Sequence, residues 1–435
     1  MEALKALAVR RLPKLCRSIS TEAAAADLPA RSPSCRSGQQ AFALALNKRL
    51  ADDAARRNAN LIFSPASVYA ALSLVAAGAR ERTLSELLGV LGAPSRDDLA
   101  RSVRVLTEQS LADQSRMGGP RINFSCDVWH DRTRTLKPAY INAAVESYKA
   151  QTGAVDFHDK PEEAAAQINA WAAASTNNLI DKIIDASRLS DLTDLVVANA
   201  IYFKGKWQEP FDKKKTKDDK FHRLDGSTVD VPFMRDSRRQ RIACHDGFKV
   251  LQLHYQEGWP QPRGIYSMCV FLPDARDGLA QLTDRITCDP DFVSKHLPTE
   301  TVSVGEFRLP KFKLDFSAGL NGVLRDLGIN EAFHLKKADF SDMVEDDGRG
   351  VSLPLEEISH RAIIEVNEEG TEATAATSLR MRGRSIQKPV LVDFVADHPF
   401  AFFVMEKLSG AIMFAGHVLD PSTSLMKRHK IDDQA

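Results

Sequence analysis

The chain has 435 residues, 43% of them hydrophobic and 27% charged, which is the composition of a globular protein with material for a sizeable core. Lys+Arg and Asp+Glu balance at 58 each, so the bulk charge predicts neither a nucleic-acid nor a membrane partner. No apolar run approaches the ~20 residues that a bilayer-spanning helix needs.

Residues 1–36 differ in pattern from the rest of the chain. They carry apolar and basic residues at helical spacing, and Glu2 is the only acid before Glu22. The segment is predicted to be a disordered extension, with an organelle transit peptide as the second interpretation. It has no uninterrupted apolar core of the kind a secretory signal needs. A cytoplasmic or nucleocytoplasmic location is expected, while an organellar or extracellular one stays open.

Helices dominate the next part of the chain. They are expected at residues 39–51, 68–77, 83–91, 96–111, 139–151 and 162–176. Residues 68–77 are apolar all round, which is typical of a helix in the centre of a core. Ser64 is placed as its N-cap, and Pro65 occupies the first helical position. Strands are expected at residues 122–128 and 195–203, and the second is continuously apolar.

After Lys204 the chain becomes rich in strands. A short helix is expected at 319–327, residues 213–219 are expected to form a solvated loop, and strands are expected at 229–234, 248–255, 265–272, 302–309, 362–366, 390–395, 399–405 and 411–418. No linker divides residues 37–425, and residues 426–435 are expected to form a C-terminal tail. The prediction is a single α+β domain.

Motifs for catalysis are missing from the sequence. There is no Gly-x-Ser-x-Gly, Gly-x-Gly-x-x-Gly, Walker or His-Glu-x-x-His pattern, the 11 histidines show no metal-ligand spacing, and the 6 cysteines include no Cys-x-x-Cys pair. No enzyme activity, cofactor or metal is therefore predicted, although a triad set by geometry alone stays open. The basic runs at 238–241 and 427–430 are interpreted as surface charge, with contact to a polyanion as the alternative.

The segment at 365–385 has two different faces when read with a period of two. Thr371, Ala373, Ala375, Thr377, Leu379 and Met381 are uncharged, whereas the alternate positions carry every charge between residues 371 and 382. This alternation is typical of a half-buried strand. The small residues nevertheless have poor strand propensity. The segment is predicted to be able to form a strand without being one at rest.

Six motifs in order give a resemblance to a known family. Residues 60–69 (NLIFSPASVY), 197–207 (VANAIYFKGKW), 309–311 (LPK), 366–373 (VNEEGTEA), 393–400 (DFVADHPF) and 414–421 (FAGHVLDP) resemble the serpins, and the fifth resembles the plant members. The resemblance implies helices mostly in the N-terminal half around large mixed β-sheets. It also implies an exposed reactive-centre loop at about residues 368–392.

The resemblance further assigns site residues. It implies a loop hinge formed by Glu368, Glu369, Gly370, Thr371, Glu372, Ala373, Thr374, Ala375, Ala376 and Thr377. The family's spacing implies a scissile bond at Arg384–Ser385, with Arg382–Gly383 as the second option because the stretch up to Asp393 is about a residue short. A region that controls opening of the sheet is implied at Ser64, Ser67, Asn199, Trp207, Lys311 and His360, with an ion pair between Lys311 and Glu368.

The implied function is irreversible inhibition of trypsin-like serine proteases. A monomeric chain would be cleaved after arginine, form a covalent acyl complex and insert its loop as a strand. Papain-like cysteine proteases that accept basic residues are a second target class. The alternative is a non-inhibitory storage, chaperone or binding protein. That alternative predicts bulky or charged residues on the inserting face, where Thr371, Ala373, Ala375 and Thr377 are small and uncharged.

Overall fold

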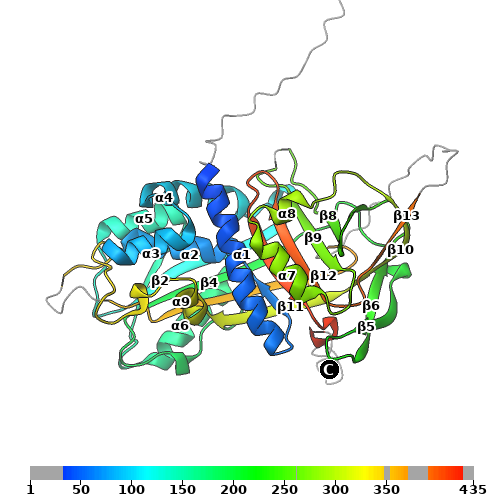
Figure 1. Cartoon of the computed structure of the whole chain (residues 1–435). Coiled ribbons are helices and arrows are strands. Elements are labelled where there is room, and N and C mark those ends of the chain that lie inside the picture. The colour runs from blue at the N-terminus through cyan, green and yellow to red at the C-terminus, as the bar shows by residue number, and fades with distance from the viewer. Residues whose placement is uncertain (1–32, 261, 347–352, 371–389, 425–435) are drawn as a thin grey trace, which may run out of the picture. The chain divides into compact units, whose positions relative to one another are not determined.

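The computed structural model describes residues 33–260, 262–346, 353–370 and 390–424 (Figure 1). Within these residues the chain forms α-helices α1 Pro33–Arg56, α2 Pro65–Gly78, α3 Glu81–Leu91, α4 Arg96–Val105, α5 Pro138–Tyr148, α6 Pro161–Ser175, α7 Leu279–Cys288, α8 Phe292–Lys295 and α9 Asn321–Asp326. Six of them precede residue 200, so the N-terminal half of the described chain is the helical half.

The strands of the described residues form three sheets. The six-stranded sheet has the order β1 (Leu61–Phe63), β15 (Ile412–Val418), β14 (Phe400–Glu406), β9 (Tyr266–Pro273), β8 (Phe248–His254) and β7 (Arg241–His245). The four-stranded sheet has the order β13 (Leu391–Val395), β10 (Ser303–Pro310), β6 (Thr228–Arg235) and β5 (Lys217–His222). The five-stranded sheet has the order β11 (Phe312–Gly319), β12 (Glu357–Val366), β4 (Leu195–Lys204), β2 (Arg121–Asp131) and β3 (Thr152–Val155).

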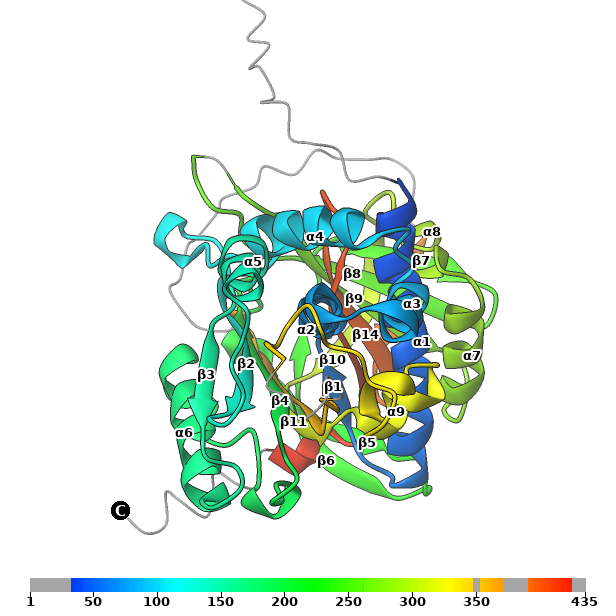
Figure 2. The same ribbon diagram turned by 90° about the vertical axis from the view of Figure 1, so that its left-hand side faces the viewer.

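Strand β4 is apolar throughout because both of its faces are covered. Val197 and Ile201 pack into the main core, which includes α2, whereas Ala198 and Tyr202 pack into a second cluster with α6. Figure 2 shows α2 and α6 on opposite sides of β4. Alternate residues of a strand point to opposite faces, so a strand buried on both faces loses its polar alternation.

The start of α2 follows the expected capping chemistry. Ser64 lies outside the helix in extended conformation, and its Oγ accepts a hydrogen bond from the backbone N–H of Ser67 at 3.2 Å. Pro65 occupies the first helical position, where its missing N–H costs nothing. Thirteen residues of the helix are buried. The predicted apolar core helix is therefore confirmed.

Several predicted elements need correction. Residues 217–219, assigned to a solvated loop, belong to β5, an exposed strand paired with β6. The strand expected at residues 362–366 begins five residues earlier, at Glu357, so His360 lies inside β12 rather than before it. Polar residues within β5 and β12 concealed the apolar periodicity of these strands.

Across the described ranges, each helix is too short or too polar to cross a membrane.

Candidate functional site at the junction of two parallel strands

The centre of the five-stranded sheet is a junction between β12 and β4. The two strands run parallel, in a register from Glu357 beside Val196 to Ile363 beside Tyr202. Both outer neighbours, β11 and β2, are antiparallel to the strand they flank. A chain inserted into this junction and running opposite to both strands would replace one parallel ladder with two antiparallel ones. Antiparallel ladders are slightly more stable per residue.

Four buried polar side chains connect β12, β4 and the start of α2. His360 lies beside Asn199 in the strand register, and its Nδ1 is 2.7 Å from Asn199 Oδ1. Ser67 Oγ donates to the same oxygen at 2.8 Å, while Ser64 N donates to His360 Nε2 at 3.1 Å. None of the four side chains is exposed. The structure therefore brings four of the six predicted sheet-opening residues into one network across the junction.

The network defines the tautomer of His360. A backbone N–H can only donate, so the contact with Ser64 N makes Nε2 of His360 the acceptor. Nδ1 must then carry the proton and donate it to Asn199 Oδ1. Burial lowers the pKa of His360 to about 3, which keeps the ring neutral.

This lowered pKa predicts a pH dependence of stability. The unfolded chain takes up a proton at its ordinary histidine pKa of about 6.5, whereas folded His360 resists protonation down to about pH 3. The neutral His360 ring therefore contributes fully to the unfolding free energy above pH 6.5, and this contribution is lost as the pH falls towards 3. In denaturant titrations between pH 7 and pH 4, we expect a shallower loss of unfolding free energy in His360→Gln than in the wild type. Equal slopes would contradict the assignment.

The chain leaves β12 at a turn that already contacts the end of β4. Asn367 and Gly370 exchange backbone hydrogen bonds at 3.2 Å, and Gly370 then pairs with Lys206 in an antiparallel bridge. The φ angle of Gly370 is 100°, and a Cβ atom there would lie 2.6 Å from Trp207 N. Glycine is required at this position. The chain thus enters the loop in the direction that an inserted strand would take beside β4.

Trp207 fastens this turn to the end of β4. Its indole Nε1 donates to Asn367 O at 2.9 Å, and its backbone N donates to Glu369 O at 3.0 Å. The ring stacks on Tyr255, with 4.5 Å between the ring centroids. Tyr255, on the segment after β8, was missed from the sequence because nothing near it in the chain marks it as a partner of the loop.

Glu368 lies at the centre of the loop entry. Its carboxylate is 3.0 Å from Lys311 Nζ and accepts a hydrogen bond from Thr216 Oγ1 at 2.7 Å. The residue is only 4% exposed. Burial alone would raise the pKa of Glu368, but the hydrogen bonds from Thr216 and Lys311 outweigh it and keep this pKa below its usual value. The structure thus contains the ion pair that the resemblance implied and adds Thr216 to it.

Charge reversal at Glu368 is expected to loosen the loop entry. Glu368→Lys would put two ammonium groups side by side and leave Lys311 without its carboxylate, at a cost of about 3 kcal/mol in unfolding free energy. Glu369→Lys is the matched control, because Glu369 pairs with Lys213, whose side chain is 64% exposed. We expect denaturant titration to show a large loss for the first variant and little change for the second. Equal losses would contradict the role of Glu368.

A second connection between β4 and β12 lies at the other end of the junction. Glu356, just before β12, accepts a hydrogen bond on Oε2 from Leu195 N at 3.1 Å, and its own N–H donates to Leu195 O at 3.1 Å. Burial raises the pKa of Glu356 to about 8. This contact could not be predicted from a local pattern, because Glu356 and Leu195 are 161 residues apart.

The predicted site residues fall into three groups. Ser64, Ser67, Asn199 and His360 form the buried network, and Trp207 and Lys311 lie at the loop entry with Glu368, Glu369 and Gly370. The remaining hinge residues and both candidate scissile bonds lie outside the described residues, namely Thr371, Glu372, Ala373, Thr374, Ala375, Ala376, Thr377, Arg382, Gly383, Arg384 and Ser385.

Comparisons with known proteins agree with this architecture. The family model for serpins (serine protease inhibitors) matches residues 37–421. The chain is 53% identical over 414 residues to a putative serpin-Z5 from rice, covering 91% of this chain and 92% of the rice protein. It is also 49% identical over 415 residues to rice serpin-Z2A, with coverage of 89% and 97%.

A solved structure from a plant shows the same fold. The native stressed conformation of Arabidopsis AtSerpin1 is 38% identical, has a TM-score of 0.83, and is matched over 89% of this chain and 98% of that chain. The chain therefore belongs to the serpin family, which in general consists of protease inhibitors. The predicted family, the resemblance to plant members and the single α+β domain are confirmed.

Proposed function

We propose that the chain is a suicide inhibitor of trypsin-like serine endopeptidases, acting as a monomer that is cleaved at Arg384–Ser385. One observation carries the proposal: the chain that leaves β12 turns back at once, and Gly370 pairs antiparallel with Lys206 at the end of β4. Insertion of the residues that follow Gly370 would therefore begin beside the junction and in the required direction.

Arg384 explains how a trypsin-like protease would recognise and cleave the loop. A protease with a carboxylate in its specificity pocket pairs with the guanidinium of Arg384 through two hydrogen bonds. Its nucleophile attacks the carbonyl carbon of Arg384, releases the amine of Ser385 and leaves an acyl-enzyme ester. Arg382–Gly383 is the second option for the bond, and Arg380 keeps the loop basic in either case.

Cleavage frees the loop to become a strand between β12 and β4. Thr371, Ala373, Ala375 and Thr377 would enter the crowded core face, while Glu372 and the arginines keep to the other face. About 13 residues at ~3.3 Å each would carry the attached protease on the order of 40 Å. A dozen ladder bonds at ~1 kcal/mol each supply on the order of 10 kcal/mol, enough to distort a protease whose own stability is of that size. Deacylation stops when the oxyanion hole is lost.

The two groups of buried contacts would control this opening. Insertion separates β12 from β4, so the hydrogen bond between His360 and Asn199 must break. When the loop enters beside the end of β4, it must also displace contacts at the loop entry such as the ion pair between Lys311 and Glu368. We infer that the network holds the junction closed until cleavage and that the ion pair sets how easily the loop enters.

Incubation with trypsin tests the proposal. An inhibitor gives an SDS-stable band with the combined mass of the protease and the residues up to the cleaved arginine, and a released peptide that begins at Ser385. A peptide that begins at Gly383 would select the second bond. Cleavage without a stable band would contradict inhibition and favour the non-inhibitory alternative. Papain-like cysteine proteases that accept basic residues are the second class to assay.

A further inference from the structure

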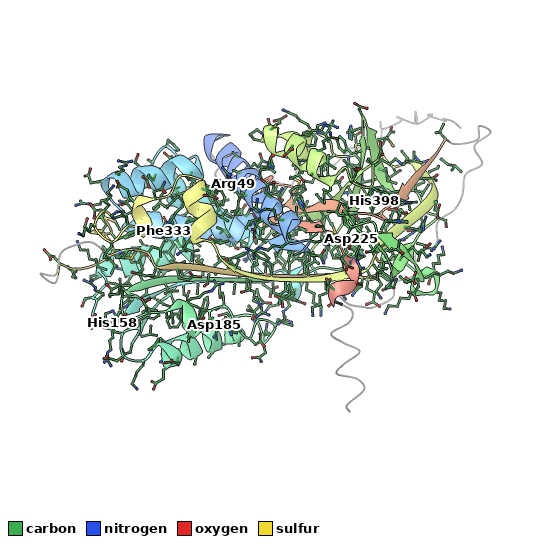
Figure 3. All side chains as sticks on the ribbon, turned by 60° about the horizontal axis from the view of Figure 1, so that its bottom comes forward. Arg49, His158, Asp185, Asp225, Phe333 and His398 are labelled. Atoms are coloured by element: carbon green, nitrogen blue, oxygen red, sulfur yellow. The ribbon has the colours of Figure 1, made fainter. Side chains whose placement is uncertain are left out.

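Three ionisable side chains meet at the end of the five-stranded sheet opposite the loop entry. Asp131 ends β2, His158 follows β3, and Asp194 directly precedes β4 (His158 is labelled in Figure 3). One nitrogen of His158 and one oxygen of each carboxylate all lie within 4.8 Å of one another. The pairing of β2 with β3 and β4 brings them together, so their spacing along the chain gave no sign of a metal site.

Asp194 directs a buried oxygen without a hydrogen-bond donor into this cluster. The residue is 8% exposed, and its Oδ2 accepts from Arg134 at 2.7 Å. Its Oδ1 is buried and accepts no hydrogen bond, although His158 Nε2 lies 3.2 Å away. A buried carboxylate oxygen without a donor is costly unless a cation lies beside it.

Asp131 is held rigidly at the same point. It is 1% exposed, and its Oδ1 accepts from Thr133 N at 2.8 Å and from Thr133 Oγ1 at 2.7 Å. Its Oδ2 accepts from Phe157 N at 2.9 Å. These donors orient the carboxylate in the way that outer hydrogen bonds orient metal ligands. Oδ1 already accepts two hydrogen bonds, whereas Oδ2 accepts one and keeps a lone-pair direction. Arg134 compensates only one of the two carboxylate charges.

We propose that Asp131, His158 and Asp194 form a binding site for Zn²⁺. Tetrahedral zinc with bonds of about 2.0–2.1 Å places neighbouring ligand atoms about 3.3 Å apart. His158 Nε2 and Asp194 Oδ1 already lie 3.2 Å apart, His158 Nδ1 lies 3.8 Å from Asp131 Oδ1, and one ligand atom of each residue lies within 4.8 Å of the others. An imidazole with two carboxylates suits zinc, whereas Mg²⁺ and Ca²⁺ prefer oxygen ligands throughout.

Titration of the chelator-treated full-length chain with ZnCl₂ tests this site. We expect calorimetry to show binding of one zinc ion and the melting temperature to rise by roughly 2–5 °C at saturation. Co²⁺ in the same site should give visible ligand-field absorption. MgCl₂ should have no such effect, and an equal response to magnesium would contradict the assignment.

Variants distinguish this site from binding elsewhere on the chain. His158→Gln removes one ligand whose side chain is 30% exposed and is expected to weaken zinc binding at least tenfold. His334→Gln, which removes an exposed imidazole on the segment after α9, is the matched control and should bind zinc like the wild type. Equal affinity of His158→Gln and the wild type, or no binding by the wild type, would overturn the proposal.

Discussion

Replacing Thr371 with arginine is expected to turn the inhibitor into a substrate of trypsin. Residue 371 directly follows Gly370, which pairs with Lys206 at the end of β4, so in the proposed insertion it would be the first residue to enter the junction. Its face of the inserted strand would meet the packed core, where an arginine side chain has neither room nor a partner for its charge. Insertion would stop at its first step. On an SDS gel, the stable band should fall at least tenfold while the cleaved chain accumulates.

Glu372→Arg is the matched control for this prediction. It adds the same arginine one residue further on, but on the face that already carries Glu372, Arg380 and Arg382. Because successive residues of a strand point to opposite faces, the added side chain would point away from the main core that contains α2. The control should keep forming the stable complex. Loss of complex in both variants, or in neither, would contradict the insertion register.

Arg384→Ala is expected to abolish complex formation with trypsin. It removes the guanidinium that pairs with the protease pocket, and losing a bidentate charged contact costs several kcal/mol of binding in the transition state. We expect the second-order rate of inhibition to fall by at least a hundredfold. Arg382→Ala is the comparison, because it removes the same side chain two residues away and on the same face. It should leave the rate within a few-fold of the wild type, and the reverse pattern would move the scissile bond to Arg382–Gly383.

Local signals explain why much of the fold could be predicted from the sequence. The N-cap at Ser64 and the apolar runs of α2 and β4 follow from residues a few positions apart. Strands such as β5 were missed because their mostly exposed, charged residues show no apolar periodicity. The ion pair between Lys311 and Glu368 was expected from the resemblance to serpins and not from the residues themselves.

Long-range contacts explain what the sequence could not give. Glu356 meets Leu195, and Asp131 meets His158 and Asp194, only after the five-stranded sheet has formed. The role of a single histidine such as His360 likewise cannot be predicted from its neighbours in the chain, because its partner Asn199 lies on the next strand. Side chains that act in pairs across strands carry no periodic signal of their own, because each partner is free to occur anywhere along the chain.

Thermal unfolding of the cleaved chain tests loop insertion most directly. If cleavage at Arg384–Ser385 lets residues 371 onwards pair with both β12 and β4, the new ladder bonds add on the order of 10 kcal/mol. The melting temperature of the cleaved chain should then exceed that of the intact chain by roughly 10 °C. The same or a lower melting temperature after cleavage would contradict insertion, and with it the proposed mechanism of inhibition.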